Sequence, residues 1–396
     1  HFGPSGLTTA SASWDLLAFM AAEDSVSFTA LHGEGGCDVA HLTADGEKLL
    51  SAGADGRCVA TDTVQVPATR LWAARVADKN SALSAIAVSA DCRWLAFGQE
   101  YGAGFGVWVC PVDVQTGPTI VKSRLIARFT LDVRHLSWHP ARAVLGVAAD
   151  DGKLTIWSEG KPRRDLISGG NGGAVRCVAF DPKGELVAAA LASGSLVVLR
   201  LKDGSECYRG AAWPKSVIGS ERLHVAWRPD GAVLALPGSA AVKLVARGDY
   251  AKSSSLLDGA HKNVATVAAW SGLVAGEWLL ATSSSDCVAI WRPPQLLHRY
   301  TSPGVVPCSL TWGGGALAIG SLSGSWARVT PPQIGPSLEA AAPPSAAGTE
   351  DAQASLGGAG TLDGQQELST EPKKKAARVE TSEKIAPTPD KPSRKN

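Results

Sequence analysis

Stretches in which apolar and polar residues alternate recur along most of the chain. Two of them are 175–190, VRCVAFDPKGELVAAA, and 223–238, LHVAWRPDGAVLALPG. Each is typical of a strand, a short turn and a second strand, because successive side chains of a strand point to opposite faces. The Asp-Gly and Pro-Lys-Gly sequences at the turns tolerate the backbone dihedrals of a hairpin. Between residues 26 and 330 apolar residues do not recur at helical spacing over three turns, so the pattern predicts an all-β fold.

The hairpin pattern is repeated seven times. The positions that mark the repeat are the large apolar side chains before each turn: Leu42, Val88, Trp138, Phe180, Trp227, Trp270 and Trp312. The six intervals from residue 42 to residue 312 average 45 residues, and a four-stranded propeller blade takes about 40–45 residues. Seven blades close into a ring, which leaves no long open sheet edge. We therefore expect a seven-bladed β-propeller over residues 26–330, with a strand around Val26 to Leu31 completing the last blade.

The segments that flank the repeats differ from them in composition. Residues 1–25 are expected to be an N-terminal extension of undetermined role. The single methionine, Met20, opens a plausible natural start, so residues 1–19 are interpreted as upstream sequence or a fragment edge. Residues 331–396 are rich in Pro, Ala, Gly, Ser, Glu and Lys and contain no aromatic residue. Such a segment buries too little apolar surface to offset its ordering entropy, so we expect a disordered tail.

The charges of this tail are segregated. Six carboxylates precede the basic run PKKKAAR at 372–378. A proline followed by a lysine run and a nearby arginine has the form of a monopartite nuclear import signal, whose basic side chains enter acidic pockets of a receptor. The candidate residues are Lys373, Lys374, Lys375 and Arg378. The alternative is a solvated charge run in a linker.

A third strand that ends in tryptophan follows some of the hairpins. Asp151 and Trp157 stand in DGKLTIW, and Asp286 and Trp291 stand in DCVAIW. In the sixth repeat His261 precedes the first strand. This order resembles the Gly-His signature of WD repeats, in which His, Asp and Trp form a buried hydrogen-bonded set. The resemblance implies that role for His261, Asp286 and Trp291, with Asp151 and Trp157 as the counterparts in the third repeat.

Composition and charge argue against several classes of protein. Eight cysteines without a C-x-x-C pair predict neither a zinc site nor a disulfide framework, but reduced, buried side chains. The net charge of +1 gives no general bias toward nucleic acid or membrane. The apolar run 16–22 is too short to span a bilayer and lacks the basic flank of a signal peptide. Potential Ser, Cys or Thr nucleophiles lack a recognisable activating motif. We therefore expect a soluble intracellular protein that is not an enzyme and has no catalytic, cofactor-binding or metal site.

One loop concentrates positive charge. Lys161, Arg163 and Arg164 surround Pro162 between the third and fourth repeats. Partners dock on the loops at propeller faces, and three basic residues stiffened by proline suit phosphate or an acidic peptide. A solubilising loop is the simpler explanation, and the sequence alone favours it.

The fifth repeat carries a more specific resemblance. Its motifs, and one before the first repeat, are ALHGEG (30–35), WP (213–214), LHVAWRP (223–229), LALP (234–237) and AVKL (241–244). They resemble the N-terminal WD-repeat propeller of the replisome adaptor family, called chromosome transmission fidelity proteins in yeasts and acidic nucleoplasmic DNA-binding, or WD-repeat and HMG-box, proteins in animals. Pro237 is expected inside a strand, which is unusual because proline removes a ladder donor.

The resemblance implies a nuclear scaffold associated with chromatin and the replication fork. Its implied roles are DNA replication, repair and chromosome cohesion, and its implied partners are the replicative helicase, DNA polymerase α and cohesion factors. Direct DNA binding is left open. Family members continue into a second propeller that trimerises and docks helical peptides, and animal members end in an HMG box. This sequence contains neither, so we expect a monomer and do not carry over that docking site.

The alternative function is that of another WD-repeat scaffold, such as a histone-binding subunit or a ubiquitin-ligase substrate receptor. Receptors of the latter kind usually carry a Trp-Asp-x-Arg box. Trp291-Arg292 lacks the aspartate of that box, so this alternative ranks lower.

Overall fold

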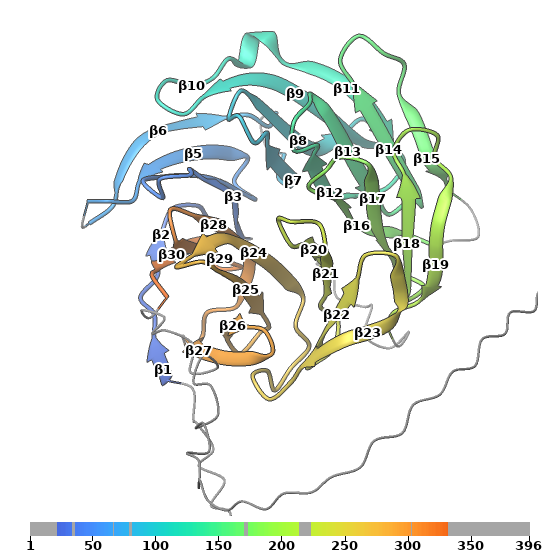
Figure 1. Ribbon diagram of the computed structural model, residues 1–396. Helices are drawn as coiled ribbons and strands as arrows, with labels where there is room; N and C mark the ends of the chain where they lie inside the picture. Colours follow the sequence, from blue (N-terminus) through green and yellow to red (C-terminus); the bar gives the residue numbers. More distant parts are fainter. Residues whose placement is uncertain are drawn as a thin grey trace, which may run out of the picture. The chain divides into compact units, whose positions relative to one another are not determined.

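The computed structural model describes residues 22–33, 36–65, 67–78, 81–169, 173–213, 223–301 and 303–331. In these ranges the strands form seven separate sheets, which are arranged as blades around a central axis (Figure 1). Helical structure in the same ranges is limited to one 3-10 turn, η1 (Ile120–Lys122). The expected all-β, seven-bladed propeller is therefore confirmed. No helix among the described residues is long and apolar enough to cross a membrane.

Each blade is built on antiparallel strands that follow one another in the chain. Blade one contains β3 (Cys37–Leu42), β4 (Lys48–Gly53), β5 (Arg57–Asp62) and β6 (Thr69–Arg75). Blade two contains β7 (Leu83–Val88), β8 (Trp94–Tyr101), β9 (Gly104–Asp113), β10 (Gly117–Pro118) and β11 (Arg124–Phe129). Blade three contains β12 (Val133–Trp138), β13 (Val144–Ala149), β14 (Lys153–Ser158) and β15 (Arg164–Ser168). Blade four contains β16 (Val175–Phe180), β17 (Leu186–Leu191), β18 (Ser195–Arg200) and β19 (Glu206–Ala211).

The last three blades follow the same plan, and two of them take in a strand from the start of the chain. Blade five contains β20 (Ala226–Trp227), β21 (Val233–Leu236), β22 (Val242–Ala246) and β23 (Asp249–Leu257). Blade six contains β24 (Val267–Val274), β25 (Glu277–Ser283), β26 (Val288–Arg292), β27 (Gln295–Thr301) and β1 (Ala22–Ser25). Blade seven contains β28 (Pro307–Gly313), β29 (Ala316–Ser321), β30 (Ser325–Val329) and β2 (Thr29–Ala30).

The ring closes through the N-terminal end of the described chain, as expected for the strand around residues 26–31. In β2, Thr29 pairs with Trp326 and Ala30 with Ser325, both in β30. Strand β1 runs parallel to β27 and adds a fifth strand to blade six. The propeller therefore includes residues from Ala22 onward, four residues before the boundary expected from the repeats.

The middle strands of a blade are buried on both faces. All six residues of β13 and all six of β17 are buried, because a neighbouring blade covers each side of the sheet. Such strands show continuous apolar runs rather than strict alternation. The outermost strands β6 and β19 keep many exposed positions, so they add little to the core.

Three of the tryptophans that mark the repeat connect adjacent blades. The indole N–H of Trp138 donates to the Ala87 carbonyl at 3.1 Å. Trp270 donates likewise to Ala226 at 3.1 Å, and Trp312 donates to Ala269 at 2.9 Å. Each acceptor lies on the innermost strand of the preceding blade. These three tryptophans therefore pack in the seams and satisfy carbonyls across them, whereas the Trp227 indole N–H is buried without a partner among the described residues.

The expectation for Pro237 is wrong, since this residue lies one position beyond β21 and not inside a strand. The missing N–H therefore costs no ladder hydrogen bond. Its carbonyl accepts a hydrogen bond from the buried indole of Trp213. Two of the blade-five motifs are thus joined by a direct contact.

Candidate functional site

A chain of hydrogen bonds in blade six joins the three residues expected to form a buried set. His261 precedes β24, and its ring is buried. Its Nδ1 lies 2.8 Å from Ser284 Oγ, and its Nε2 lies 2.7 Å from Thr282 Oγ1. The Trp291 indole donates to Thr282 Oγ1 at 2.9 Å, and the Ser284 hydroxyl donates to Asp286 Oδ1 at 2.8 Å. We call these five residues the blade-six relay; the sequence analysis missed its two hydroxyls.

The relay is satisfied when His261 is neutral. The Thr282 hydroxyl then donates to Nε2 while accepting from Trp291, and an Nδ1 proton donates to Ser284. Burial lowers the pKa of His261 from 6.5 to about 4, against the opposing charge of Asp286. At Asp286, burial raises the pKa, but hydrogen bonds from Ser284 and from backbone N–H groups outweigh it and lower the pKa overall. A neutral imidazole therefore stands beside an ionised carboxylate.

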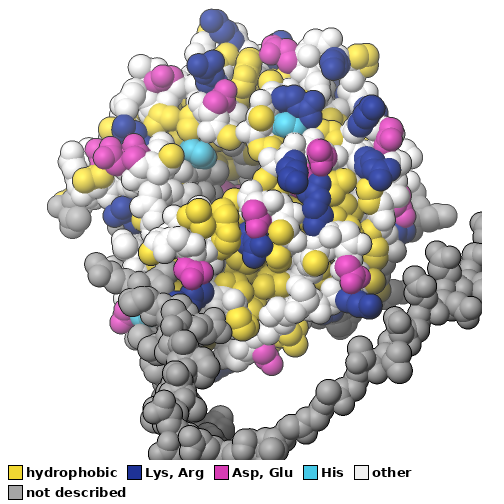
Figure 2. Space-filling view, in the orientation of Figure 1, with side chains coloured by type: hydrophobic (Ala, Val, Ile, Leu, Met, Phe, Trp, Pro, Cys, Tyr) yellow, Lys and Arg dark blue, Asp and Glu magenta, His cyan; other side chains and the backbone are white. Residues whose placement is uncertain are grey.

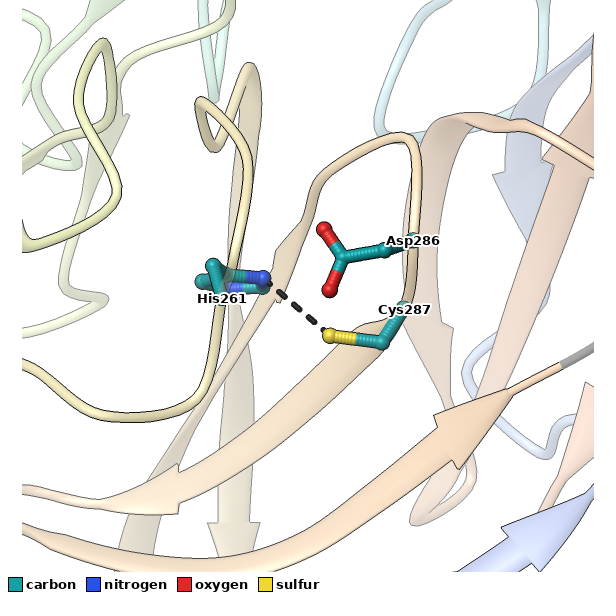
Figure 3. Close-up of side chains that lie close together, drawn as sticks. All are labelled: His261, Asp286 and Cys287. Atoms are coloured by element: carbon teal, nitrogen blue, oxygen red, sulfur yellow. Dashed lines mark hydrogen bonds between the residues drawn. The ribbon is translucent and has the colours of Figure 1, made fainter.

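Cys287 adds a sulfur to this cluster, which places three metal-ligating residue types together (Figure 3). The atoms offered by His261, Asp286 and Cys287 all lie within 4.8 Å of one another, and Cys287 Sγ is 3.3 Å from His261 Nδ1. Both imidazole nitrogens already bond hydroxyls, and the Arg299 guanidinium lies 3.7 Å from the Asp286 carboxylate. Burial also raises the pKa of the Cys287 thiol, which favours the protonated form over the thiolate that binds metals. The arrangement suits a structural network better than a metal centre.

Blade one contains a similar network that the sequence analysis missed. His32 Nδ1 lies 3.1 Å from Asp55 Oδ1, and Nε2 lies 3.0 Å from Ser51 Oγ. Burial lowers the pKa of His32 despite the opposing charge of Asp55. A signal was present, because His32 and Ser51 are 19 residues apart, close to the 21 residues between His261 and Thr282. The third strand of blade one does not end in tryptophan, so the sequence of this blade lacks the residue that marks the set in blade six.

The blade-three counterparts, Asp151 and Trp157, are not joined by such a relay. Trp157 pairs with Leu145 across the sheet, as Trp291 pairs with Leu280 in blade six. Two residues beyond Leu145 stands Val147, which has no hydroxyl where blade six has Thr282. Trp157 instead packs edge-on against Trp138, with ring centroids 6.3 Å apart. Asp151 accepts a backbone hydrogen bond from Lys153 at 3.1 Å, which stabilises the turn.

The basic loop of blade three lies at the edge of a large cavity on the described surface. Lys161 and Arg163 are exposed on the turn between β14 and β15, and Arg164 begins β15. All three line a groove of about 1190 Å³ that also receives residues from blades four and five. The Arg164 guanidinium donates to the carbonyls of Leu201 and Lys202 in blade four, the latter at 2.8 Å.

The fold adds cations to this groove that are distant in sequence. Arg142 lies on the turn before β13, and Arg247 lies after β22. Arg200 is the last residue of β18, and Lys202 lies on the turn that follows. Arg247 forms ion pairs with Asp181 at 2.6 Å and with Glu185 at 2.9 Å. Together with the three residues of the basic loop, they line what we call the cationic groove. The sequence analysis missed these four residues because they come from separate turns.

The remaining sequence expectations concern cysteines and the tail. Cys207, which lines the cationic groove, is exposed, and Cys92 is half-buried; the expectation of burial is wrong for both. The other six cysteines are buried, and all eight are free thiols. The nuclear import candidates Lys373, Lys374, Lys375 and Arg378 lie outside the described residues.

A comparison with protein-family models identifies the repeat. The family described as WD domain, G-beta repeat matches residues 160–198. This segment begins before the outermost strand of blade three, β15, and ends within β18 of blade four. The sequence repeat is therefore offset from the blade, as is also seen where the N-terminal β2 completes blade seven.

Curated proteins provide the second comparison. The chain is 25% identical over 211 residues to WD repeat and HMG-box DNA-binding protein 1 of Homo sapiens, a match that covers 51% of this chain and 18% of that protein. The proteins of the same name from Mus musculus and Xenopus laevis are each 24% identical over the same length. The matched region thus spans about a fifth of the length of these relatives. The seven blades and the repeat match support a WD-repeat propeller, and its sequence is similar to that of WD-repeat and HMG-box DNA-binding proteins.

Proposed function

We propose that this protein is a nuclear interaction scaffold associated with chromatin and the DNA replication fork. It binds other proteins and performs no covalent chemistry of its own. The finer roles are those implied by the family: replication, repair and chromosome cohesion, through the replicative helicase, DNA polymerase α and cohesion factors. Nuclear entry is assigned to the basic run at 372–378.

The similarity to WD-repeat and HMG-box DNA-binding proteins over 51% of the chain carries this proposal. WD-repeat propellers serve generally as non-enzymatic platforms for protein interactions. A ring whose strands are packed on both faces holds its loops in fixed positions, so partners meet a preorganised surface. The buried histidine networks of blades one and six support the ring and therefore need no catalytic role.

Affinity purification of the tagged full chain from nuclear extract, with nuclease treatment and mass spectrometry, tests the proposal. We expect recovery of helicase, polymerase α or cohesion factors. Recovery of cullin adaptors or histone chaperones in their place would favour another WD-repeat scaffold. Nuclease treatment separates protein contacts from co-purification through DNA.

Nuclear entry is tested separately with a fluorescent fusion of the full chain. Alanine at the four import candidates should move the fusion from the nucleus to the cytoplasm. The matched control removes four other cations of the tail and should leave the fusion nuclear: Lys384, Lys391, Arg394 and Lys395. A fusion that stays nuclear without the four import candidates but becomes cytoplasmic without the four control cations would contradict the assignment.

A further inference from the structure

The cationic groove combines three features that together define a ligand. It is built by turns on one face of blades three, four and five. Figure 2 shows Lys and Arg side chains gathered over this part of the ring, around a patch of hydrophobic side chains. The cavity of about 1190 Å³ exceeds the roughly 300–1,000 Å³ typical of small-molecule pockets. Its size suits a segment of polypeptide.

The charge of the groove is strongly unbalanced. Seven of its lining residues are Lys or Arg, and Glu185 is the single carboxylate among them. Within the described part of the chain, Lys161, Arg163, Arg200 and Lys202 have no carboxylate partner within ion-pair distance. Neighbouring carboxylates are engaged elsewhere: Glu159 pairs with Arg124 and Asp165 accepts from Thr155. Asp203 interacts electrostatically with Arg200, so Lys161, Arg163 and Lys202 are the cations left to be neutralised by solvent ions or by a ligand.

The groove also has an apolar floor. Val144, Ile156, Leu186 and Leu201 line it between the basic side chains, and Tyr250 closes it at blade five. These side chains are largely buried and held in the blade cores, so the floor is fixed in shape. A ligand that fills the groove must therefore bring apolar groups as well as negative charge.

We propose that the cationic groove binds an acidic segment of a partner protein in which aliphatic side chains alternate with carboxylates. This inference rests on the proposed scaffold function and names the partner chemistry. A nucleic-acid backbone would satisfy the cations but leave the aliphatic floor without a partner. Single-stranded bases would need aromatic side chains to stack on, and the one aromatic side chain of the groove, Tyr250, is only 7% exposed. Charge complementarity together with the apolar floor thus favours a peptide.

The first test measures binding of a fluorescein-labelled peptide of alternating aspartate and leucine to the full chain by anisotropy. The triple variant Lys161→Glu, Arg163→Glu, Lys202→Glu should bind it about tenfold more weakly, since each exposed ion pair contributes a factor of roughly 1.5 to 5. The matched control reverses three exposed cations of blades one, two and seven and should bind normally: Arg70→Glu, Lys122→Glu and Arg328→Glu. Equal weakening in both variants would show nonspecific attraction and overturn the proposal.

A second comparison changes the ligand and keeps the protein. A peptide with serine in place of every leucine has the same charge and should bind more weakly, because the apolar floor stays uncovered. Duplex DNA that binds more tightly than the leucine peptide, and loses affinity in the triple groove variant, would identify the groove as a nucleic-acid site and overturn the peptide assignment.

Cys207 provides an independent readout of occupancy. It is the one exposed cysteine of the eight and lines the groove. Saturating leucine peptide should slow its alkylation by iodoacetamide severalfold, as followed by mass spectrometry of the intact chain. Unchanged alkylation during saturated binding would place the peptide elsewhere and refute the site.

The purification from nuclear extract separates this inference from the proposed function. If the triple groove variant recovers the same replication proteins as the wild type, the groove inference fails and the scaffold function stands. If neither protein recovers nuclear partners but the groove binds the peptide selectively, the scaffold function fails and the groove stands.

Discussion

Acidification should destabilise the propeller through His261. Burial holds the pKa of this histidine at about 4 in the folded protein, whereas the unfolded value is 6.5. As the pH falls below about 6.5, His261 is protonated in the unfolded chain but stays neutral in the folded chain. The free energy of unfolding therefore decreases between about pH 6.5 and pH 4. A difference of 2.5 pKa units between those two values corresponds to about 3 kcal/mol. Above about pH 6.5 the neutral His261 costs no stability, and below about pH 4 its protonation causes no further decrease in the free energy of unfolding.

The variant His261→Gln isolates this contribution. At neutral pH the loss of two buried hydrogen bonds should cost about 1–3 kcal/mol. Glutamine does not titrate, so the variant escapes the acid penalty that the wild type suffers. The gap between the two proteins should therefore close as the pH falls, and near pH 4 the variant should be as stable as the wild type. Guanidinium unfolding followed by tryptophan fluorescence at a series of pH values measures this gap.

Thr282→Val is the matched control for that experiment. It removes the hydroxyl that contacts both His261 and Trp291 but leaves the imidazole in place. We expect a lower stability at every pH, with nearly the same pH dependence as the wild type. A gap between wild type and His261→Gln that stays constant from neutral pH to pH 4 would refute the assignment of a buried neutral histidine.

Two further substitutions probe the seams between blades. Trp270→Phe removes the donor to the Ala226 carbonyl across the seam of blades five and six and should lower the free energy of unfolding by about 1–2 kcal/mol, measured by denaturant titration; no loss would mean that water replaces the indole. Gly320→Ala places a Cβ against the Cys37 carbonyl where blade seven meets blade one, and it should lower the melting temperature by several degrees. In the control Gly272→Ala the added Cβ meets open space, so the melting temperature should not change. Equal melting temperatures for the two alanine variants in scanning calorimetry would contradict the tight closure of the ring.

The number of blades could be predicted from the sequence because each blade repeats the same inner hairpin. Strands such as β13 and β17 must be apolar on both faces, and that requirement marks every repeat. The outermost strands give no comparable signal. In β23, six of nine residues are exposed, and its sequence DYAKSSSLL is largely polar. Its pairing with β22 fixes it in place, and such pairing is not visible in local composition.

The candidate sites could be predicted only as far as local sequence patterns mark their residues. His261, Asp286 and Trp291 could be assigned because a family pattern supplies their order. The hydroxyls of Thr282 and Ser284 lie on a serine-rich stretch, TSSSD, in which no single residue stands out. The cationic groove was visible only in part, since Lys161 to Arg164 is local whereas its other cations come from turns in three blades. The ring geometry alone brings those turns together.

The relay and the groove lie on opposite faces of the ring, and this arrangement makes them independent. The blade-six relay involves the turn between the second and third strands of its blade, whereas the groove uses turns between first and second and between third and fourth strands. In an antiparallel sheet these two kinds of turn stand at opposite ends of the strands. Substitutions that are far apart and share no partners usually have additive effects.

Substitutions in the relay should therefore change only the stability of the protein, and substitutions in the groove only its affinity for the peptide. Thr282→Val should lower the free energy of unfolding and leave the affinity for the acidic leucine peptide unchanged. The triple groove variant should weaken peptide binding without the loss of stability seen for Thr282→Val, because Lys161, Arg163 and Lys202 are exposed and their side chains make no ion pair in the described part of the chain. The combined variant should show both effects at their separate magnitudes. A coupling between them larger than about 0.5 kcal/mol would mean that the blades transmit a change from one face to the other, and the ring would then act as a responsive element rather than a rigid support.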